Sequence, residues 1–245
     1  MPPIDPLSFL VVSVATFAGA VVSGLAGFAF SAVAGAILLH VLPPTEAVPL
    51  MMACSIVTQA VSLVSLRDTV KWRVDPAMIG SGAIGVLPAL FLLSHVDAHL
   101  FRIGFGIFLV AYAAYMLSRR TVARESGAPR RLRRVMVGFG GGLIGGLTAM
   151  PGAMMVIWCD LRGLPKDEQR ALSQPYVLAM QVIALTLMIA QSTIEAHTLV
   201  SLTYSLPALF AGAALGVLMF RRINDAYFRS AVLGLLLFGG VGLVM

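Results

Sequence analysis

The sequence contains little charge for its length, and long stretches of the chain contain none. Asp, Glu, Lys and Arg make up only 11% of its 245 residues and apolar residues make up 59%, whereas a soluble domain carries about 25% charged residues. Neither these four residue types nor His occurs in residues 6–39, 47–66, 76–94, 103–118, 135–159, 171–194, 198–220 and 230–245. Because roughly 20 apolar residues cross a hydrocarbon core of about 30 Å, the sequence predicts an all-α polytopic membrane protein.

Groups that enzymes and metal sites use are also scarce. Cys54 and Cys159 stand alone in apolar runs and form no CxxC pair, which predicts that both are packing residues. The chain has no G-x-S-x-G motif, no Walker loop and no paired carboxylates within its apolar runs. His95, Asp97 and His99 lie close together, but they have no evident further ligand and favour a short interfacial loop over a metal site. We therefore expect no enzymatic activity, no bound metal and no cofactor.

The basic residues follow a pattern that indicates membrane topology. The net charge is +6, and every one of the 17 Lys and Arg residues except Arg102 falls in residues 67–73, 119–134, 162–170 or 221–229. Loops rich in Lys and Arg stay in the cytoplasm and are attracted to anionic lipid. The pattern argues against nucleic-acid binding. It predicts a multi-pass membrane protein with a cytoplasmic central linker and with N- and C-termini on the opposite, periplasmic side.

The chain repeats itself in outline, because Glu46 returns as Glu168, 122 positions later. The other matches are Gly24-Leu25 with Gly146-Leu147, Leu42-Pro43 with Leu164-Pro165, and Gln59 with Gln181. Such internal duplication is typical of transporters. We interpret residues 1–118 as a first membrane repeat, 119–134 as a basic cytoplasmic linker and 135–245 as a second membrane repeat.

The first apolar run of each repeat predicts a helical hairpin that leaves the membrane on the side it entered. Only this arrangement places all four basic stretches on one side. Each repeat then consists of a hairpin and three transmembrane helices, an odd number, so the two repeats are inverted. Arms of about 13 residues in the second hairpin reach only ~20 Å, which predicts a re-entrant hairpin. The first hairpin, with arms of about 16 residues, fits either a re-entrant or a short double-spanning geometry.

The hairpin tips, near residues 23–27 and 148–152, are where a ligand site is expected. Irregular backbone at membrane depth persists only where protein or a water-lined cavity satisfies it, and a helix beginning there directs N–H groups at that cavity. With no charge in the apolar runs, a small anion would be held at the midplane by tip backbone amides and neutral side chains. The candidate binding residues are Ser23, Gly24, Gly27, Ser31, Ser55, Thr58, Gln59, Thr148, Gly152, Gln174 and Gln181. The alternative for the glycines is close helix packing.

Two matched pairs of polar residues leave two interpretations each. Gln59 and Gln181 lie 14 residues after the helix caps expected at Thr45 and Asp167, which places them deep in the membrane. Each amide could bond to the tip backbone, contact the ligand, or do both. Glu46 and Glu168 follow those caps, where a carboxylate complements the helix dipole, and as the matched acids they are also candidates for proton coupling.

These motifs resemble those of the TauE/SafE sulfite exporter family, also called the 4-toluene sulfonate uptake permease family. The resemblance rests on GLAGF at residues 24–28, GGLTAMPG at 145–152, the entries LPPTEA and LPKDEQ, the basic linker and the total length. It implies a carrier of a small oxyanion, such as sulfite, sulfoacetate or a related organosulfonate or carboxylate, across the bacterial inner membrane.

We expect a secondary transporter that works by alternating access, with the two repeats rocking around a midplane anion site. A passive anion channel is the alternative, and a membrane assembly factor without transport activity is a more distant one. The expected partners are the anion and the lipid bilayer, and a homodimer is compatible with the sequence.

Overall fold

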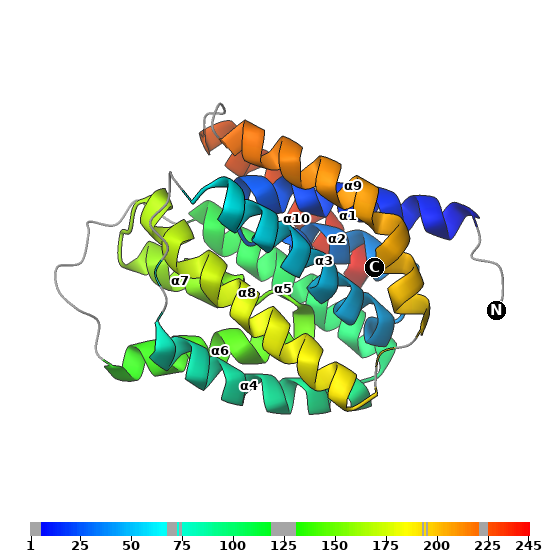
Figure 1. Cartoon of the computed structure of the whole chain (residues 1–245), viewed down its shortest axis with the longest axis horizontal. Helices are drawn as coiled ribbons and strands as arrows, with labels where there is room; N and C mark the ends of the chain where they lie inside the picture. The colour runs from blue at the N-terminus through cyan, green and yellow to red at the C-terminus, as the bar shows by residue number, and fades with distance from the viewer. Residues whose placement is uncertain are drawn as a thin grey trace.

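The structure is a computed structural model that describes residues 6–67, 73, 75–118, 131–192, 194, 196–220 and 225–245. The prediction of an all-α protein is confirmed, since these residues form helices joined by short turns (Figure 1). The helices are α1 Pro6–Ala26, α2 Phe30–Leu38, α3 Pro44–Ser65, α4 Pro76–His95, α5 Ala98–Ser118, α6 Arg131–Thr148, α7 Gly152–Leu161, α8 Lys166–Ala190, α9 Ala196–Phe220 and α10 Asp225–Val244. The predicted linker ends earlier than expected, because residues 131–134 begin α6; its other residues, 119–130, lie outside the described part of the chain.

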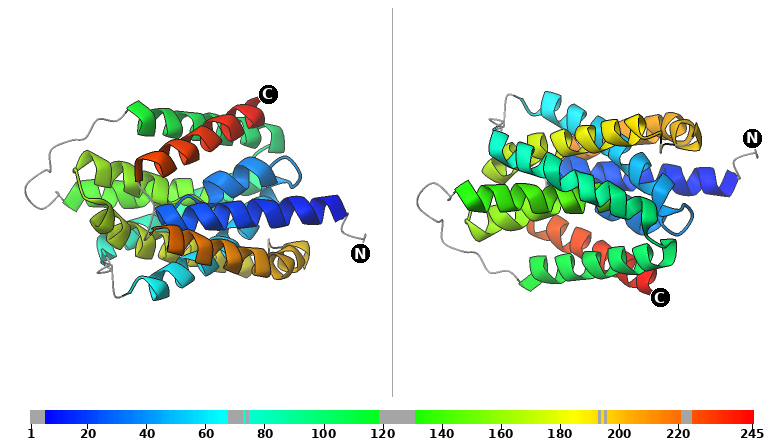
Figure 2. Two further views of the ribbon diagram at one scale, coloured as in Figure 1. Left: turned by 90° about the horizontal axis from the view of Figure 1, so that it is seen from above. Right: turned by 90° about the horizontal axis from the view of Figure 1, so that it is seen from below.

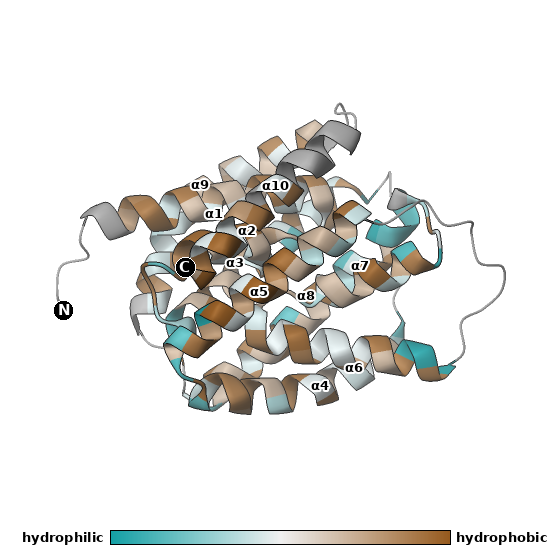
Figure 3. Ribbon diagram, turned by 180° about the vertical axis from the view of Figure 1, so that it is seen from behind, coloured by the Kyte–Doolittle hydropathy of each residue, from teal (hydrophilic) through white to brown (hydrophobic). Residues whose placement is uncertain are grey.

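The polytopic prediction is also confirmed. Within the described parts of the chain, 6 helices are long and apolar enough to cross a membrane: α1, α3, α4, α5, α8 and α9. Hydrophilic residues gather where α6 and α8 begin and around the turn between α4 and α5, and apolar residues cover the helix sides between these ends (Figure 3). This distribution fits a bundle whose sides face lipid.

The helices run along one common direction, so the bundle has two ends. Helices α4, α6, α8 and α10 begin at one end, and α3, α5, α7 and α9 finish there (Figures 1 and 2). The described basic residues of the four stretches, among them Arg67, Arg131 and Arg162, lie where these helices begin or finish, and we call this the basic end. The hairpin of α1 and α2 starts and finishes at the other end, whereas the hairpin of α6 and α7 starts and finishes at the basic end (Figure 1).

Helices from the two halves of the sequence interleave. Helix α1 packs along α9, α4 packs along α6, and α5 packs along α10. Glycines bring these pairs together: a Cβ added to Gly24 of α1 would lie 2.9 Å from the Cα of Gly216 of α9, and one added to Gly142 of α6 would overlap the carbonyl oxygen of Gly82 of α4. Small residues allow such approach between membrane helices. Gly85, Gly212 and Gly216 likewise pack closely against neighbouring helices, whereas Gly80 faces open space.

Helices α3 and α8 begin in the same way, but two residues earlier than the sequence predicts. Their N-caps are Pro43, with φ −66° and ψ 154°, and Pro165, with φ −63° and ψ 156°. Thr45 and Asp167 therefore lie inside the helices, and the prediction that they are the caps is wrong. Proline fixes φ near −65°, and together with an extended ψ this directs the chain into the first helical turn without a side-chain cap.

Candidate functional site

Each hairpin is broken by three non-helical residues. The first break comprises residues 27–29, between α1 and α2, and the second comprises residues 149–151, between α6 and α7. The second lies where the sequence predicts it, but the first lies a few residues later than predicted, so Ser23 and Gly24 belong to α1. Gly27 has a φ of +87° and Ala149 a φ of 55°. This left-handed conformation ends a helix readily at glycine, which explains why α1 continues to Ala26.

The two arms of each hairpin differ in length, and the expectation of equal arms is wrong. Helix α1 has 21 residues and α2 has 9, and α6 has 18 residues and α7 has 10. At 1.5 Å per residue the second arms are only ~15 Å long. The second arms, α2 and α7, are too short to cross a core of about 30 Å, and the re-entrant interpretation requires this. The first arm of the first hairpin, α1, is long enough to cross it.

The two breaks lie against each other. The hydroxyl of Ser31, in the first turn of α2, donates a hydrogen bond of 2.6 Å to the carbonyl oxygen of Ala149. A Cβ added to Gly152, the first residue of α7, would lie 2.7 Å from the Cβ of Phe28. Ser31 and Ala149 are each 1% exposed. Residues far apart in the sequence thus form one buried junction, which we call the break junction: residues 27–31 and 149–152.

The matched amides brace the break junction. Gln59 of α3 donates through Nε2 to the carbonyl oxygen of Gly27 at 3.0 Å, and Gln181 of α8 donates through Nε2 to that of Ala149 at 3.1 Å. This confirms that the two amides bond to the tip backbone; a contact with ligand stays a prediction. Both Oε1 atoms are buried without a hydrogen-bond partner in the described residues. Each hairpin is therefore held by a helix from its own half of the sequence.

The sequence reasoning missed a buried cation beside the first break. Arg170 of α8 is 3% exposed, and its guanidinium donates to the carbonyl oxygens of Gly24 at 2.7 Å and Leu25 at 3.0 Å. Its Nε also donates to Oε1 of Gln174 at 3.3 Å. Arg170 borders the apolar run of residues 171–194 and was attributed to a basic loop. Arg170 lies four residues before Gln174, which puts both on one helix face. This spacing is the sequence feature that could have linked Arg170 to the candidate site.

The remaining predicted residues have more local roles. The hydroxyl of Thr148 donates to the carbonyl oxygen of Ile144 at 2.7 Å, and the hydroxyl of Thr58 donates to the backbone carbonyl oxygen of Ser55 at 2.9 Å, so both bond within their own helix. The hydroxyls of Ser23 and Ser55 are buried and have no partner within the described ranges. Gly24 packs against α9. These positions show no direct contribution to the break junction.

The matched acids lie away from the break junction. Glu46 and Glu168 are in the first turns of α3 and α8, and these two helices begin at opposite ends of the bundle (Figure 1). An acid in the first turn complements the helix dipole, so that explanation fits both positions. Their coupling role stays a prediction.

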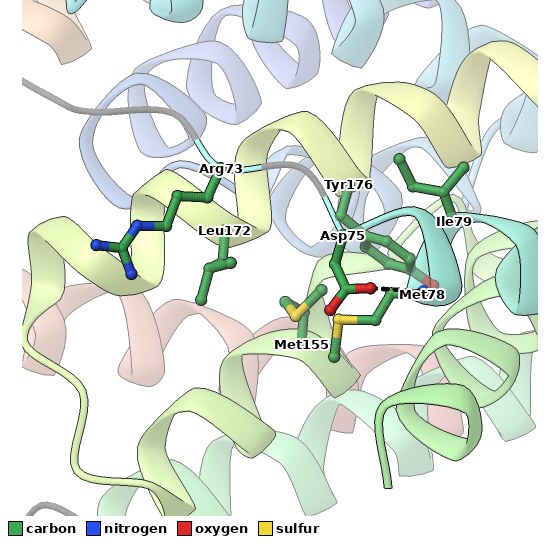
Figure 4. A pocket seen from close by; sticks show the side chains of 7 residues that line it. All are labelled: Arg73, Asp75, Met78, Ile79, Met155, Leu172 and Tyr176. Carbon is green, nitrogen blue, oxygen red and sulfur yellow. Dashed lines mark hydrogen bonds between the residues drawn. The ribbon is translucent and has the colours of Figure 1, made fainter. Parts of the chain in front are cut away.

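A small pocket lies at the end of the bundle where α4 and α8 begin (Figure 4). It is lined by Arg73, Asp75, Met78, Ile79, Met155, Leu172 and Tyr176. Asp75 caps α4 by accepting from the backbone N–H groups of Ala77 and Met78, and it pairs with Arg134 of α6 at 3.1 Å. The side chain of Arg73 points away from Asp75 (Figure 4). A carboxylate among apolar groups does not favour an anion, so this pocket is not the expected site.

No metal centre emerges from the side chains that the structure describes, since no three His, Cys, Asp or Glu residues among them are grouped to hold an ion. His95 instead lies against Phe91, with ring centroids 4.3 Å apart. Asp97 accepts hydrogen bonds from the backbone N–H groups of Leu100 and His99, and these hold the pKa of its carboxyl below the usual 3.8. Asp97 thus serves as a helix cap.

Comparison with known proteins gives one family match. The family model described as "Sulfite exporter TauE/SafE" matches residues 11–243, nearly the whole chain. No curated protein and no solved structure matches the chain.

Proposed function

The chain belongs to the TauE/SafE sulfite exporter family, and on that premise we propose that it is a secondary transporter of a small oxyanion across the bacterial inner membrane. Sulfite, sulfoacetate and related organosulfonates or carboxylates are the substrates to test. The observation that carries the proposal is the break junction, where the hydroxyl of Ser31 in one hairpin bonds to the backbone of Ala149 in the other.

The break junction has the electrostatic character that an anion requires. Helices α2 and α7 both begin at it, and the N-terminus of a helix carries the equivalent of roughly +0.5 charge together with N–H groups that lack an intrahelical acceptor. The two N-termini lie together, because Ser31 of α2 contacts Ala149 just before α7. An oxyanion bound there would interact with two positive helix ends and with the neutral donors around them.

The hydrogen bonds divide into those within one half of the sequence and those between halves. Gln59 and Gln181 each tie a hairpin to a helix of its own half. The bonds from Ser31 to Ala149 and from Arg170 to Gly24 and Leu25 join opposite halves. The two hairpins start and finish at opposite ends of the bundle (Figure 1). Breaking and re-forming the bonds between the halves would therefore expose the anion to one end of the bundle and then to the other.

The packing favours a more local motion than the rocking of whole repeats. Rocking would separate α1 from α9 and α4 from α6, where glycines hold the helices in close contact. The short helices α2 and α7 are the elements whose movement would leave those contacts in place. We therefore assign alternating access to the two short arms and their breaks, with the interleaved long helices as the frame.

The orientation follows from the basic end of the bundle. Loops rich in Lys and Arg stay in the cytoplasm, so the end where α4, α6 and α8 begin would face the cytoplasm. The end at which the hairpin of α1 and α2 opens would face the periplasm. Glu46 and Glu168 would then lie at opposite faces of the membrane, with one matched acid at each mouth of the carrier.

Counterflow in proteoliposomes tests the proposal. Vesicles preloaded with sulfite would take up labelled sulfite faster than empty vesicles, and sulfoacetate, sulfate, thiosulfate or lactate would be added outside as competitors, with a cation as the control. Accelerated uptake that one class of anion inhibits supports a carrier. Uptake that is indifferent to internal anion indicates a channel, and no uptake by folded, correctly inserted protein rejects anion transport.

A further inference from the structure

The candidate binding residues named from the sequence are all uncharged, and the buried guanidinium of Arg170 lies beside the first break in addition to them. Resting on the proposed function, we propose that Arg170 and Gln174 form the charge-selective part of that site. In the structure as it stands, Arg170 holds the carbonyl oxygens of Gly24 and Leu25. When an oxyanion binds, Arg170 exchanges at least one of these carbonyls for an oxygen of the anion.

The geometry places both side chains at the break. A Cβ added to Gly27 would lie 3.3 Å from Nε2 of Gln174 and 3.4 Å from Cγ of Arg170. The carbonyl oxygen of the same glycine accepts the bond from Gln59. Gly27 is therefore enclosed by α3 on one side and by the Arg170–Gln174 pair of α8 on the other, one residue from the break junction contact of Phe28 with Gly152.

The orientation of the Gln174 amide leaves a donor that needs an acceptor. Arg170 donates through Nε to Oε1 of Gln174, which identifies that atom as the oxygen and assigns the donor to the other position. Nε2 of Gln174 is buried, in a side chain with 0% exposure, and has no acceptor in the part of the chain that the structure describes. A buried donor without an acceptor is unfavourable, and an oxyanion between Gln174 and Arg170 would supply one.

The carbonyls that Arg170 holds are ligands that an anion can replace. They belong to the last turn of α1, and the C-terminal end of a helix carries partial negative charge. A guanidinium bonds more strongly to an oxyanion than to a neutral carbonyl, and its planar fork fits two oxygens of one anion. Binding of the anion would loosen the tie between α8 and the end of α1, and this links substrate recognition to movement of the first break.

The repeat shows that this pair is not a general structural requirement of the fold. By the spacing that relates Gln59 to Gln181, Arg170 corresponds to Val48 and Gln174 corresponds to Met52. Both counterparts are buried and apolar. The two hairpins are thus braced alike by glutamines, but the position equivalent to Arg170 in the other repeat carries no charge. This asymmetry assigns selection for charge to the first break.

The rival interpretation is that Arg170 merely caps the C-terminus of α1, and substitutions separate the two roles. Arg170→Lys keeps the charge and loses the fork. Gln174→Met removes the unpartnered donor together with the Oε1 that accepts from Nε of Arg170, and it places at this position the residue that the other repeat has. Gln174→Glu removes the donor but keeps an acceptor for Arg170. Gln174→Glu adds a carboxylate that pairs with Arg170 and competes with the substrate. Arg131→Gln, at an exposed position at the start of α6, changes the net charge by −1 as Gln174→Glu does, and it is the control for that change.

The measurement is the sulfite concentration that gives half-maximal counterflow, together with the melting temperature of each purified variant. We expect about a tenfold increase for Arg170→Lys and for Gln174→Met, since a charge-assisted hydrogen bond contributes about that factor. For Gln174→Glu we expect loss of counterflow with an unchanged or higher melting temperature. Arg131→Gln should match the wild type.

The proposal is overturned if the folded Gln174 variants keep a half-maximal concentration within about twofold of the wild-type value. A pure capping role would give that result, with Arg170→Lys lowering the melting temperature alone. Should Arg170→Lys not fold, the two Gln174 substitutions decide, because Nε2 of Gln174 makes no hydrogen bond to the residues that the structure describes. Failure of the wild type to exchange any anion would instead reject the proposed function, so the two failures are distinguishable.

Discussion

The bonds that brace the two breaks predict unequal effects for two similar substitutions. Gln59→Leu and Gln181→Leu each remove one buried amide and its hydrogen bond to a break carbonyl. The carbonyl oxygen of Ala149 keeps a second donor, the hydroxyl of Ser31 at 2.6 Å. The carbonyl oxygen of Gly27 has no donor other than Gln59 among the described residues. Gln59→Leu should therefore destabilise the protein more than Gln181→Leu.

The magnitude follows from what each substitution leaves behind. An interhelical hydrogen bond in a membrane protein contributes about 0.6 kcal/mol on average, and we expect Gln181→Leu to cost roughly this much. A buried carbonyl without any donor costs about 1–3 kcal/mol, which places Gln59→Leu about 1 kcal/mol lower in stability than Gln181→Leu. Both variants also remove an unpartnered Oε1, so that contribution cancels in the comparison. For a chain of this length, 1 kcal/mol corresponds to about 2–4 °C in Tm.

Thermal unfolding in detergent, followed by tryptophan fluorescence, measures the difference, and a double-mutant cycle supplies the control. Ser31→Ala and Gln181→Leu each leave Ala149 one donor, whereas the double variant leaves none. The loss in the double variant should exceed the sum of the single losses by about 1 kcal/mol. Equal melting temperatures for Gln59→Leu and Gln181→Leu, or strict additivity in the cycle, would refute the reasoning.

Further substitutions test the helix packing, the first break and the basic end. Gly142→Ala should lower Tm because its Cβ would overlap Gly82, whereas Gly104→Ala, which meets open space, should leave Tm unchanged or raise it. Gly27→Ala should lower both Tm and the counterflow rate, since a φ of +87° strains any L side chain and its Cβ would meet Gln174. Asp75→Ala should cost about 1 kcal/mol and Asp75→Asn less, because the amide keeps the cap of α4 and loses only the ion pair; equal losses would contradict this.

Much of the fold could be predicted from the sequence because hydropathy and charge act over whole segments. Long uncharged runs predicted the helices, and the length of the second apolar run located the second break near residues 148–152. The first break was harder to locate, since Gly24 and Gly27 look alike in the sequence. Only the packing of Gly24 on α9 and the positive φ of Gly27 distinguish them.

The candidate site was predicted in part. The Gln59–Gln181 match located both braces, because residues that recur at one spacing in two repeats occupy equivalent places. Arg170 was missed since a basic residue next to a loop was interpreted by topology alone. Its helical spacing to Gln174 and Gln181 puts all three residues on one face of α8, and this shared face could have been predicted from the sequence. The inverted relation of the repeats, the orientation of the termini and a homodimer stay predictions.

The most direct test of the central claim is whether a transported anion occupies the break junction. Ser31→Cys, in a protein whose buried Cys54 and Cys159 are replaced by Ala, would be labelled with N-ethylmaleimide with and without the anion that gives the strongest counterflow among sulfoacetate, sulfate and lactate. Ser94→Cys, exposed at the end of α4, is the control. The account predicts that the anion slows labelling at position 31 and leaves position 94 unchanged. Labelling of position 31 that is the same with and without the anion, in protein that still performs counterflow, would contradict it.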